Sequence, residues 1–444
     1  MSVSTKLQQP SVRGSVFRYG NWAVDEQLGT LTCGYLLDGR EFTERVTLAP
    51  GPRWHTDAAR AAARLVFLLA GVSYYKTAAP PVIDLGPTAL TDAELAFLRE
   101  FYLQGLGEFA YRNTLDLTPL RIEARRADAQ APGQPEPATP RKALVPFGGG
   151  IDSIVVVERV RRLADAALFV VSRPADRFAA IEEPAAVTGL PVVRAEREID
   201  PQLLRSAELG FLNGHVPVTG ILSAIAVLAA VLEDRDAVVM SNEWSASVPT
   251  LRYQGRPVNH QYSKSADFEA GFRSVTAGGP EYFSWLRDRT ELWVGREFAG
   301  LQAYHGSFRS CNKAFYTDPA RRLDHWCGRC DKCCFIDLIL APFLPATTLE
   351  RIFVQTDEPL ADPELAPKFL ALLGAGAKPF ECVGEVNECR AAVLQAARRA
   401  DRTASPLLQE LAAEVAGWPD APTAADAAAM LEPLGENFIP AGYR

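Results

Sequence analysis

The sequence has no excess of positive charge, because its 54 Asp and Glu residues outnumber its 46 Lys and Arg residues. The formal net charge of −8 is not the electrostatic footprint of a protein that grips duplex nucleic acid, so no nucleic-acid partner is expected. Long apolar runs are missing too. The longest, residues 218–232, falls short of the roughly 20 residues that span a bilayer, and Glu233 and Asp234 follow it. We expect a buried helix there and no membrane partner.

Features of secreted proteins are equally scarce. Residues 1–20 contain no apolar segment of the kind that a secretory signal requires. The chain has 8 cysteines in 444 residues, and half of them fall within 327–334, which does not resemble a disulfide framework. We therefore expect a cytoplasmic protein. An apolar content of 48% excludes wholesale disorder, and the length predicts about three domains.

The N-terminal part predicts an α+β domain. Residues 15–50 alternate between apolar and polar types and carry turn signals, which predicts a small antiparallel sheet. Helical spacing follows over 57–69 and again over 91–111. We assign these elements to a domain of residues 1–124, in which no segment has a recognisable chemical meaning. Residues 125–142 are poor in apolar residues and rich in proline, so they predict a linker.

Strands and helices alternate after this linker. Apolar strands are predicted over 142–147, 167–172, 191–195 and 236–241, with helices over 154–165, 179–188 and 218–232 between them. Such alternation is typical of an α/β fold, a parallel sheet with helices on both faces, and we assign it to a domain of residues 143–336. Residues 337–444 are predicted to be mostly helical.

The most specific segment is Gly148-Gly149-Gly150-Ile151-Asp152-Ser153, between a predicted strand and a predicted helix. Glycines allow a tight turn and the close approach of a ligand, and the free N–H groups at a helix start favour an anion. Asp152 fits a divalent cation that bridges it to phosphate oxygens, and Ser153 adds a hydroxyl donor. The segment is neither a Walker A loop nor a dinucleotide fingerprint. The plainest alternative is a glycine-rich turn with a capping aspartate.

In place, order and flanks this segment resembles the PP-loop, SGGxDS, of the ATP pyrophosphatases. The resemblance implies a site for ATP and Mg²⁺, with cleavage between the α and β phosphates and adenylation of an oxygen of the substrate. It also implies that the nucleotide is bound by Gly148, Gly149, Gly150, Asp152 and Ser153. Gly148 stands where that family usually has a serine, so one hydroxyl contact is missing or replaced.

A cysteine cluster is the second specific feature. Cys311, Cys327, Cys330 and Cys333 have spacings suited to tetrahedral zinc. An iron–sulfur cluster and unliganded thiols are the alternatives. Several PP-loop enzymes that modify deazapurines carry a comparable group of four cysteines. Cys334 is interpreted as a spare thiol, and His325 as a substitute ligand.

Polar segments, 241–247 and 259–265, follow the strand at 236–241. The carboxyl ends of strands carry the ligand in open α/β sheets, so these segments are candidates for the site. Candidate metal ligands, phosphate or carboxylate contacts and proton carriers are His215, Asn242, Glu243, His260, Tyr262 and Lys264, with Arg309 as a further positive charge. Each of them alone also fits an ordinary loop position.

Cys382 and Cys389 form another pair of thiols. Paired thiols can serve as the two bases of an amino-acid racemase. These two lie about two helical turns apart in the sequence, a spacing that gives no convergent geometry by itself. The sequence therefore favours ordinary buried cysteines, with Cys382 as a minor candidate for proton transfer.

The order of the segments PFGGGIDS, SNEWSAS, NHQYSKS, CGRCDKC and KPFECVGE, after the N-terminal domain and the linker, resembles the MurL family over nearly the full chain. Members are ATP-dependent UDP-N-acetyl-α-D-muramoyl-L-alanyl-L-glutamate epimerases of peptidoglycan synthesis. The resemblance implies that the terminal L-Glu of UDP-MurNAc-L-Ala-L-Glu is converted to D-Glu through an acyl-adenylate, with release of AMP and diphosphate. Catalytic candidates are then Asp152, Ser153, His215, Glu243, His260 and Lys264.

Two other functions stay open at this point. One is a PP-loop ligase or nitrile-forming enzyme that acts on a nucleobase or tRNA, for which the four cysteines would be the family mark. The other is a nucleotide-binding protein with a degenerate loop, as Gly148 would suggest. The oligomeric state is left open as well.

Overall fold

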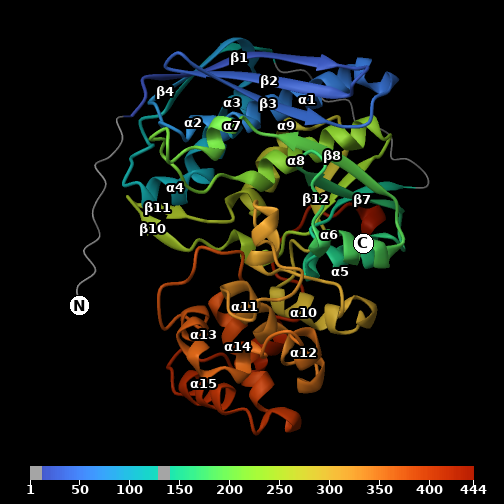
Figure 1. Cartoon of the computed structure of the whole chain (residues 1–444), viewed down its shortest axis with the longest axis vertical. Coiled ribbons are helices and arrows are strands. Elements are labelled where there is room, and N and C mark those ends of the chain that lie inside the picture. Colours follow the sequence, from blue (N-terminus) through green and yellow to red (C-terminus); the bar gives the residue numbers. More distant parts are fainter. Residues whose placement is uncertain (1–12, 129–140) are drawn as a thin grey trace.

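In a computed structural model, which describes residues 13–128 and 141–444, one large sheet runs through the molecule (Figure 1). Its 10 strands lie in the spatial order β12 (Glu281–Ser284), β9 (Ala237–Met240), β6 (Lys142–Pro146), β7 (Asp165–Ser172), β8 (Val192–Glu198), β3 (Arg40–Thr47), β2 (Thr30–Leu37), β1 (Val16–Asp25), β4 (Val82–Leu90) and β5 (Arg121–Arg126). Most neighbouring strands are parallel. A separate hairpin consists of β10 (Leu251–Tyr253) and β11 (Arg256–Val258).

The N-terminal strands extend the same sheet. The antiparallel pairing predicted within residues 15–50 is confirmed as β1–β2 and β2–β3, but β3 also pairs antiparallel with β8. Joining two strand edges satisfies backbone groups that would otherwise face solvent. A buried ion pair reinforces this junction, with Arg197 Nε 2.8 Å from Glu44 Oε1. The two sheets that the sequence predicts as separate are therefore one.

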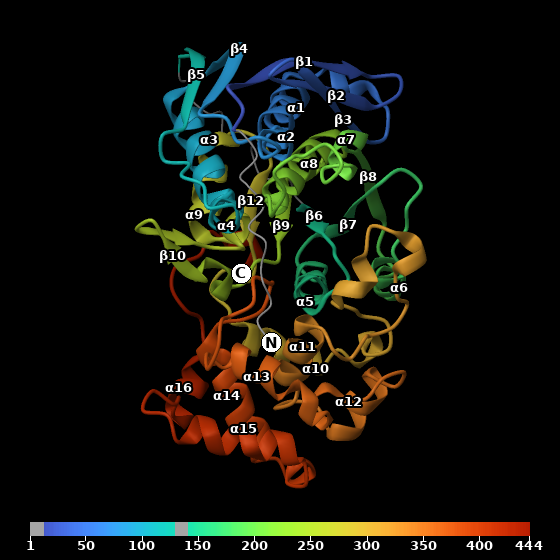
Figure 2. The same cartoon turned by 60° about the vertical axis from the view of Figure 1, so that its left-hand side comes forward.

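Helices cover both faces of the sheet, as predicted. One face shares an apolar core with α1 (Asp57–Ala70), α3 (Asp92–Gly105), α8 (Val218–Leu232) and α9 (Ala266–Val275). The core on the other face contains α5 (Ile151–Val160), α6 (Ala179–Thr188), α10 (Glu291–Ala299) and α11 (Asp331–Leu340), and there α10 packs against α5 and against α11. Figure 2 shows α8 and α5 on opposite sides of β6. Alternate residues of β6 enter the two cores: Leu144 belongs to the core that contains α8, whereas Ala143 and Val145 belong to the core that contains α5. The chain is thus an α/β protein.

Most helix predictions agree with the structure. Helices α6 and α8 have the predicted bounds. The helix predicted over 154–165 begins earlier, at Ile151, and ends earlier, at Val160. The helix predicted over 91–111 is divided at Leu106 into α3 and α4 (Gly107–Arg112). The short helices α2 (Val72–Tyr75) and α7 (Pro201–Leu204) were not predicted. The predicted linker lies between β5 and β6, and most of it, residues 129–140, is outside the described residues.

The C-terminal helices gather at the end of the molecule opposite β1–β3 (Figure 2). They are α12 (Ala346–Ile352), α13 (Ala366–Leu372), α14 (Val386–Ala397), α15 (Pro406–Ala416) and α16 (Ala424–Ala429). Within residues 13–128 and 141–444, no helix combines the length and the apolar character needed to cross a membrane.

Candidate active site

The glycine loop between β6 and α5 has one position where only glycine fits. Gly149 has φ 76°, and a Cβ there would lie 2.0 Å from the carbonyl oxygen of Ala180. Gly150 is the N-cap of α5, and no side chain caps the helix. A Cβ at Gly148 would meet nothing within 4 Å. The first N–H groups of α5 are therefore open to an anion, and there is free space beside Gly148.

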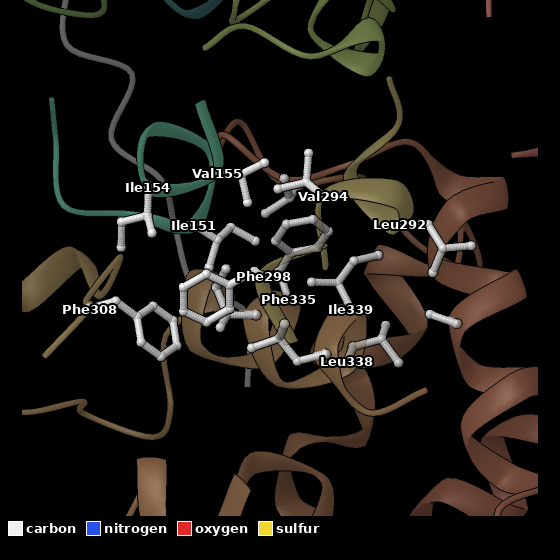
Figure 3. Close-up of a cluster of buried hydrophobic side chains, with 14 of the residues drawn as sticks. Ile151, Ile154, Val155, Leu292, Val294, Phe298, Phe308, Phe335, Leu338 and Ile339 are labelled. Carbon is white, nitrogen blue, oxygen red and sulfur yellow. The ribbon is translucent and has the colours of Figure 1, made fainter. Parts of the chain in front are cut away.

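Apolar packing fixes the start of α5 relative to two other helices. Figure 3 shows the buried cluster, in which Ile151, Ile154 and Val155 of α5 gather with Leu292, Val294 and Phe298 of α10 and with Phe335, Leu338 and Ile339 of α11. Asp152, Glu291 and Lys332 lie in the first turns of these three helices. Anchoring the helices therefore anchors the three charged side chains.

Three carboxylates meet beside the glycine loop. Asp152, Glu243 and Glu291 each have a carboxylate oxygen within 4.8 Å of the others, a set we call the acid cluster. Glu243 and Glu291 are both 3% exposed. Among the described residues, Asp152 Oδ1 and Glu291 Oε2 are buried without a hydrogen-bond partner. Buried carboxylate oxygens that lack donors fit a divalent cation.

The electrostatics of the acid cluster follow from this crowding. Burial and the neighbouring Glu243 raise the pKa of Asp152 to about 6. Burial, Asp152 and Glu243 raise the pKa of Glu291 well above its usual range. Glu388, in the first turn of α14, accepts a hydrogen bond from the Leu292 amide at 3.2 Å, and burial raises its pKa to about 8. Full ionisation of the three carboxylates is therefore unfavourable unless a cation binds among them.

Two lysines and an arginine lie around the acid cluster. The charges of Lys264 and Lys332 both act on Asp152. Buried Arg287 pairs with Glu269 at 2.8 Å and donates to the carbonyl oxygens of Glu243, at 3.1 Å, and Lys264, at 2.6 Å. Arg287 thus fixes the backbone that presents one carboxylate and one ammonium group.

A second polar group, formed by Glu108, His215 and His260, adjoins the acid cluster. Glu108 of α4 is hydrogen-bonded to His260 Nδ1, and the rings of His260 and His215 are 4.2 Å apart. Burial, together with His260, lowers the pKa of His215 to about 4. Burial opposes protonation of His260 as well, but hydrogen bonds to Cys382 and Glu108 outweigh it and raise its pKa to about 9. One imidazole is therefore neutral and the other charged at pH 7.

Cys382 connects the two groups. Lys264 Nζ lies 3.2 Å from Cys382 Sγ, and Lys332 Nζ donates to the Cys382 carbonyl oxygen. Burial favours the thiol, but the charge of Lys264 and the hydrogen bond from His260 prevail and lower the pKa of Cys382 to about 6. The site thus holds a thiolate at neutral pH.

The four predicted metal-binding cysteines converge. Sulfur atoms of Cys311, Cys327, Cys330 and Cys333 all lie within 4.8 Å of one another. Cys327 and Cys333 are 3.7 Å apart, and Cys330 and Cys333 3.4 Å. Zinc–sulfur bonds of about 2.3 Å in a tetrahedron place sulfurs about 3.8 Å apart, so the group fits zinc.

Two models of known protein families match this chain. The model of the MurL N-terminal domain matches residues 8–285, and that of the MurL C-terminal domain matches residues 307–426. The chain belongs to the MurL family. Three relatives named UDP-N-acetyl-alpha-D-muramoyl-L-alanyl-L-glutamate epimerase are similar over most of their length. That of Salinispora tropica is 38% identical (97% of this chain, 95% of the relative), that of Xanthomonas oryzae pv. oryzae 40% (87% of each), and that of a Micromonospora species 37% (97% of each).

Family membership confirms the resemblance seen in the sequence and the expectation of an enzyme. The MurL relatives are epimerases by name, and epimerases are isomerases. No solved structure is significantly similar to the chain.

Several predicted residues of this MurL-family chain lie outside the two polar groups. Ser153 donates to the carbonyl oxygen of Gly150 at 3.1 Å, within the loop. Tyr262 packs against Phe268, and the backbone of Asn242 is tied to Ser284 by hydrogen bonds of 2.7 Å. The thiols of Cys334 and Cys389 are buried, and His325 pairs with Asp324 instead of joining the four cysteines.

The sequence also missed residues that the fold brings to the site. Glu108 comes from the N-terminal part, for which no chemical meaning was predicted. Glu291, Glu388 and Lys332 lie in first turns of helices, and Arg287 is buried next to Glu269. An acidic residue at a helix start is accounted for by the helix dipole alone, so the sequence offered no separate signal.

Arg309 lies against the glycine loop. Its backbone N–H donates to the Gly149 carbonyl oxygen at 3.3 Å, and its side chain pairs with Glu183. Its Nη1 is buried without a hydrogen-bond partner in the described part of the chain. Arg309 is two residues from Cys311, so the cysteine group anchors the segment that borders the glycine loop.

Proposed function

We propose that this chain uses ATP to convert the terminal L-glutamate of UDP-MurNAc-L-Ala-L-Glu to D-glutamate in peptidoglycan precursor synthesis. The names of the three relatives support the substrate. The observation that carries the chemistry is the glycine loop, which opens onto an uncapped helix start beside three buried carboxylates. We interpret the strand, loop and helix from β6 to α5 as a PP-loop, and the domain around them as a PP-loop fold.

The residues present fit ATP and Mg²⁺. Phosphate oxygens would accept from the first N–H groups of α5, and Ser153 and Arg309 lie at the loop to add donors. Asp152, Glu243 and Glu291 would hold Mg²⁺, which prefers carboxylate oxygens together with phosphate. The bound ion would neutralise phosphate charge during attack on the α phosphorus.

Adenylation makes epimerisation feasible. The α-proton beside a free carboxylate is very weakly acidic, because its removal would create a dianionic enolate. Attack of the glutamate carboxylate on the α phosphate releases diphosphate and gives an acyl-adenylate without that charge. Lys264 and Lys332, next to the acid cluster, would stabilise the enolate formed from it. Water then cleaves the adenylate, which releases AMP and makes the reaction effectively irreversible.

We also propose a structural zinc ion at Cys311, Cys327, Cys330 and Cys333. Their sulfur separations support it. Cys330 is also the N-cap of α11, the helix whose first turn contains Lys332. The ion would hold Arg309 against the glycine loop and Lys332 against the acid cluster. Its contribution would be to position residues rather than to take part in the reaction.

The test is a diphosphate-release assay with ATP, Mg²⁺ and UDP-MurNAc-L-Ala-L-Glu, run in D₂O with mass analysis of the peptide product. Diphosphate release that depends on this substrate, with one deuterium in a product containing D-Glu, is the expected result. Release with a deazapurine or tRNA but not with this peptide would refute the epimerase function and favour a base-modifying enzyme. Release with none of them would refute the PP-loop interpretation.

A further inference from the structure

The glycine loop and the acid cluster account for adenylation but leave the proton transfer without a residue. Cys382 lies between the acid cluster and the two adjacent histidines, His215 and His260. Its sulfur faces the Lys264 ammonium group at 3.2 Å, Lys332 donates to its carbonyl oxygen, and His260 is near enough to lower the pKa of the thiol. Two elements far apart in the sequence thus direct positive charge at one thiol.

The histidine beside Cys382 is itself fixed. Glu108 is hydrogen-bonded to His260 Nδ1, and Arg112 Nε donates to Glu108 Oε1 at 2.5 Å. The Phe380 ring, two residues before Cys382, packs with Arg112 and His260. Helix α4 and the segment before α14 therefore hold the imidazole and the thiol together.

We propose that the Cys382 thiolate removes the α-proton of the adenylated L-glutamyl residue, with Lys264 and His260 as positioning residues that keep the sulfur ionised and oriented. This assignment rests on the proposed function. It makes Cys382, which the sequence treated as a minor candidate, the first of the two proton carriers.

The step balances as a proton transfer. The Cα–H bond breaks, an S–H bond forms at Cys382, and the electron pair moves to the carbonyl oxygen of the acyl-adenylate as an enolate. A proton of solvent origin is then delivered to the opposite face of Cα, which gives the D configuration. Cys382 returns its proton to solvent before the next cycle, so one solvent hydrogen enters the product for each turnover.

The charges around Cys382 support this direction of transfer. Lys264, His260 and Lys332 face it, Glu108 and His215 face His260, and Asp152 and Glu243 face Lys264. The balance lowers the pKa of Cys382 to about 6, so the thiolate is ready to accept a proton at pH 7. A thiolate of this kind removes a proton from the L-substrate rather than donating one.

Cys389 provides a matched control. It is fully buried in α14, where burial raises the pKa of its thiol, and it belongs to the apolar core instead of the site. Cys389→Ala removes a thiol from the same region of the chain without touching the polar groups around Cys382.

The experiment compares wild type, Cys382→Ala, Cys382→Ser and the control Cys389→Ala in D₂O with ATP, Mg²⁺ and UDP-MurNAc-L-Ala-L-Glu. Both Cys382 variants should keep substrate-dependent diphosphate release but lose α-deuterium and D-Glu by at least ~10²-fold, as expected for loss of a general base. They would hydrolyse the adenylate back to undeuterated L-Glu. The control should behave as wild type.

Three outcomes would overturn the proposal. Deuterated D-Glu formed by Cys382→Ala at a rate near wild type would show that another group removes the proton. Loss of diphosphate release in both folded variants would assign Cys382 to adenylation. A glutamyl adduct on Cys382 in intact-mass spectra would make it a nucleophile. If wild type itself releases no diphosphate with this peptide, the proposed function fails and this assignment with it.

Alkylation gives a readout independent of activity. Iodoacetamide should modify Cys382 with a midpoint near pH 6 in wild type. In Lys264→Met and His260→Gln the midpoint should move toward about 8.5, the value of a free thiol. An unchanged midpoint in both variants would refute their positioning role.

Discussion

Substitution of one glycine in the loop gives the sharpest test of its geometry. A Cβ at Gly149 would lie 2.0 Å from the Ala180 carbonyl oxygen, whereas ordinary contact begins at 3.4 Å, so the atoms must separate by about 1.4 Å. The positive φ adds about 1–2 kcal/mol and overpacking about 1–3 kcal/mol. Reduced entropy of the unfolded chain offsets about 0.4–1 kcal/mol. We expect Gly149→Ala to lower the free energy of unfolding by about 1–5 kcal/mol.

The same displacement should affect catalysis. Misplacing a positioning group by about 1 Å costs on the order of 10²-fold in rate, so diphosphate release by Gly149→Ala should fall by about that factor. Gly148→Ser is the matched control, because a Cβ there meets nothing within 4 Å. It should unfold within about 0.5 kcal/mol of wild type in urea and keep its diphosphate release. Equal urea midpoints and rates for Gly149→Ala and wild type would refute the reasoning, as would a Gly148→Ser variant as damaged as Gly149→Ala.

Three further perturbations test the rest of the site. Asp152→Asn should reduce AMP formation by at least ~10³-fold with an unchanged circular dichroism spectrum, because a cation ligand is lost; unchanged turnover would contradict the PP-loop. Cys330→Ala should lower the zinc content from one equivalent per chain and raise the KM for ATP, whereas Cys334→Ala should do neither; equal zinc in both would contradict the metal site. The rate of deuterium incorporation should fall below about pH 6, as Cys382 takes up a proton, and above about pH 9, as His260 loses one. A rate that stays constant between about pH 5 and about pH 10, measured by mass spectrometry, would contradict the roles of Cys382 and His260.

The local elements of this fold were within reach of the sequence. The apolar run from Val218 to Leu232 could only be buried, and α8 has these bounds. The glycine loop was recognised because strand, turn and helix signals follow one another within residues 142–165. Such features depend on neighbouring residues, which the sequence displays directly.

Tertiary features were not within reach. The pairing of β3 with β8 joins residues far apart in the chain, and no local pattern distinguishes an edge that pairs from an edge that faces solvent. Glu108 looked like one half of a surface pair with Arg112, four residues along a helix. Only the fold brings His260 against it. Cys382 was weighed as a partner of Cys389, because the sequence could not reveal that Lys264 lies beside it.

The repulsion between the carboxylates of the acid cluster is larger than the stabilisation that Asp152 and Glu291 each gain from their helices. An acidic residue in the first turn of a helix gains about 0.3–1 kcal/mol from the helix dipole, which alone would account for Asp152 and Glu291. With Glu243, however, their oxygens lie within 4.8 Å of one another, and at an effective dielectric constant of about 20 each ionised pair repels by about 3 kcal/mol. The repulsion exceeds the gain, so helix stability does not explain why three carboxylates converge there. A divalent cation would convert the repulsion into attraction, and the glycine loop beside the carboxylates would hold the phosphates that share this ion.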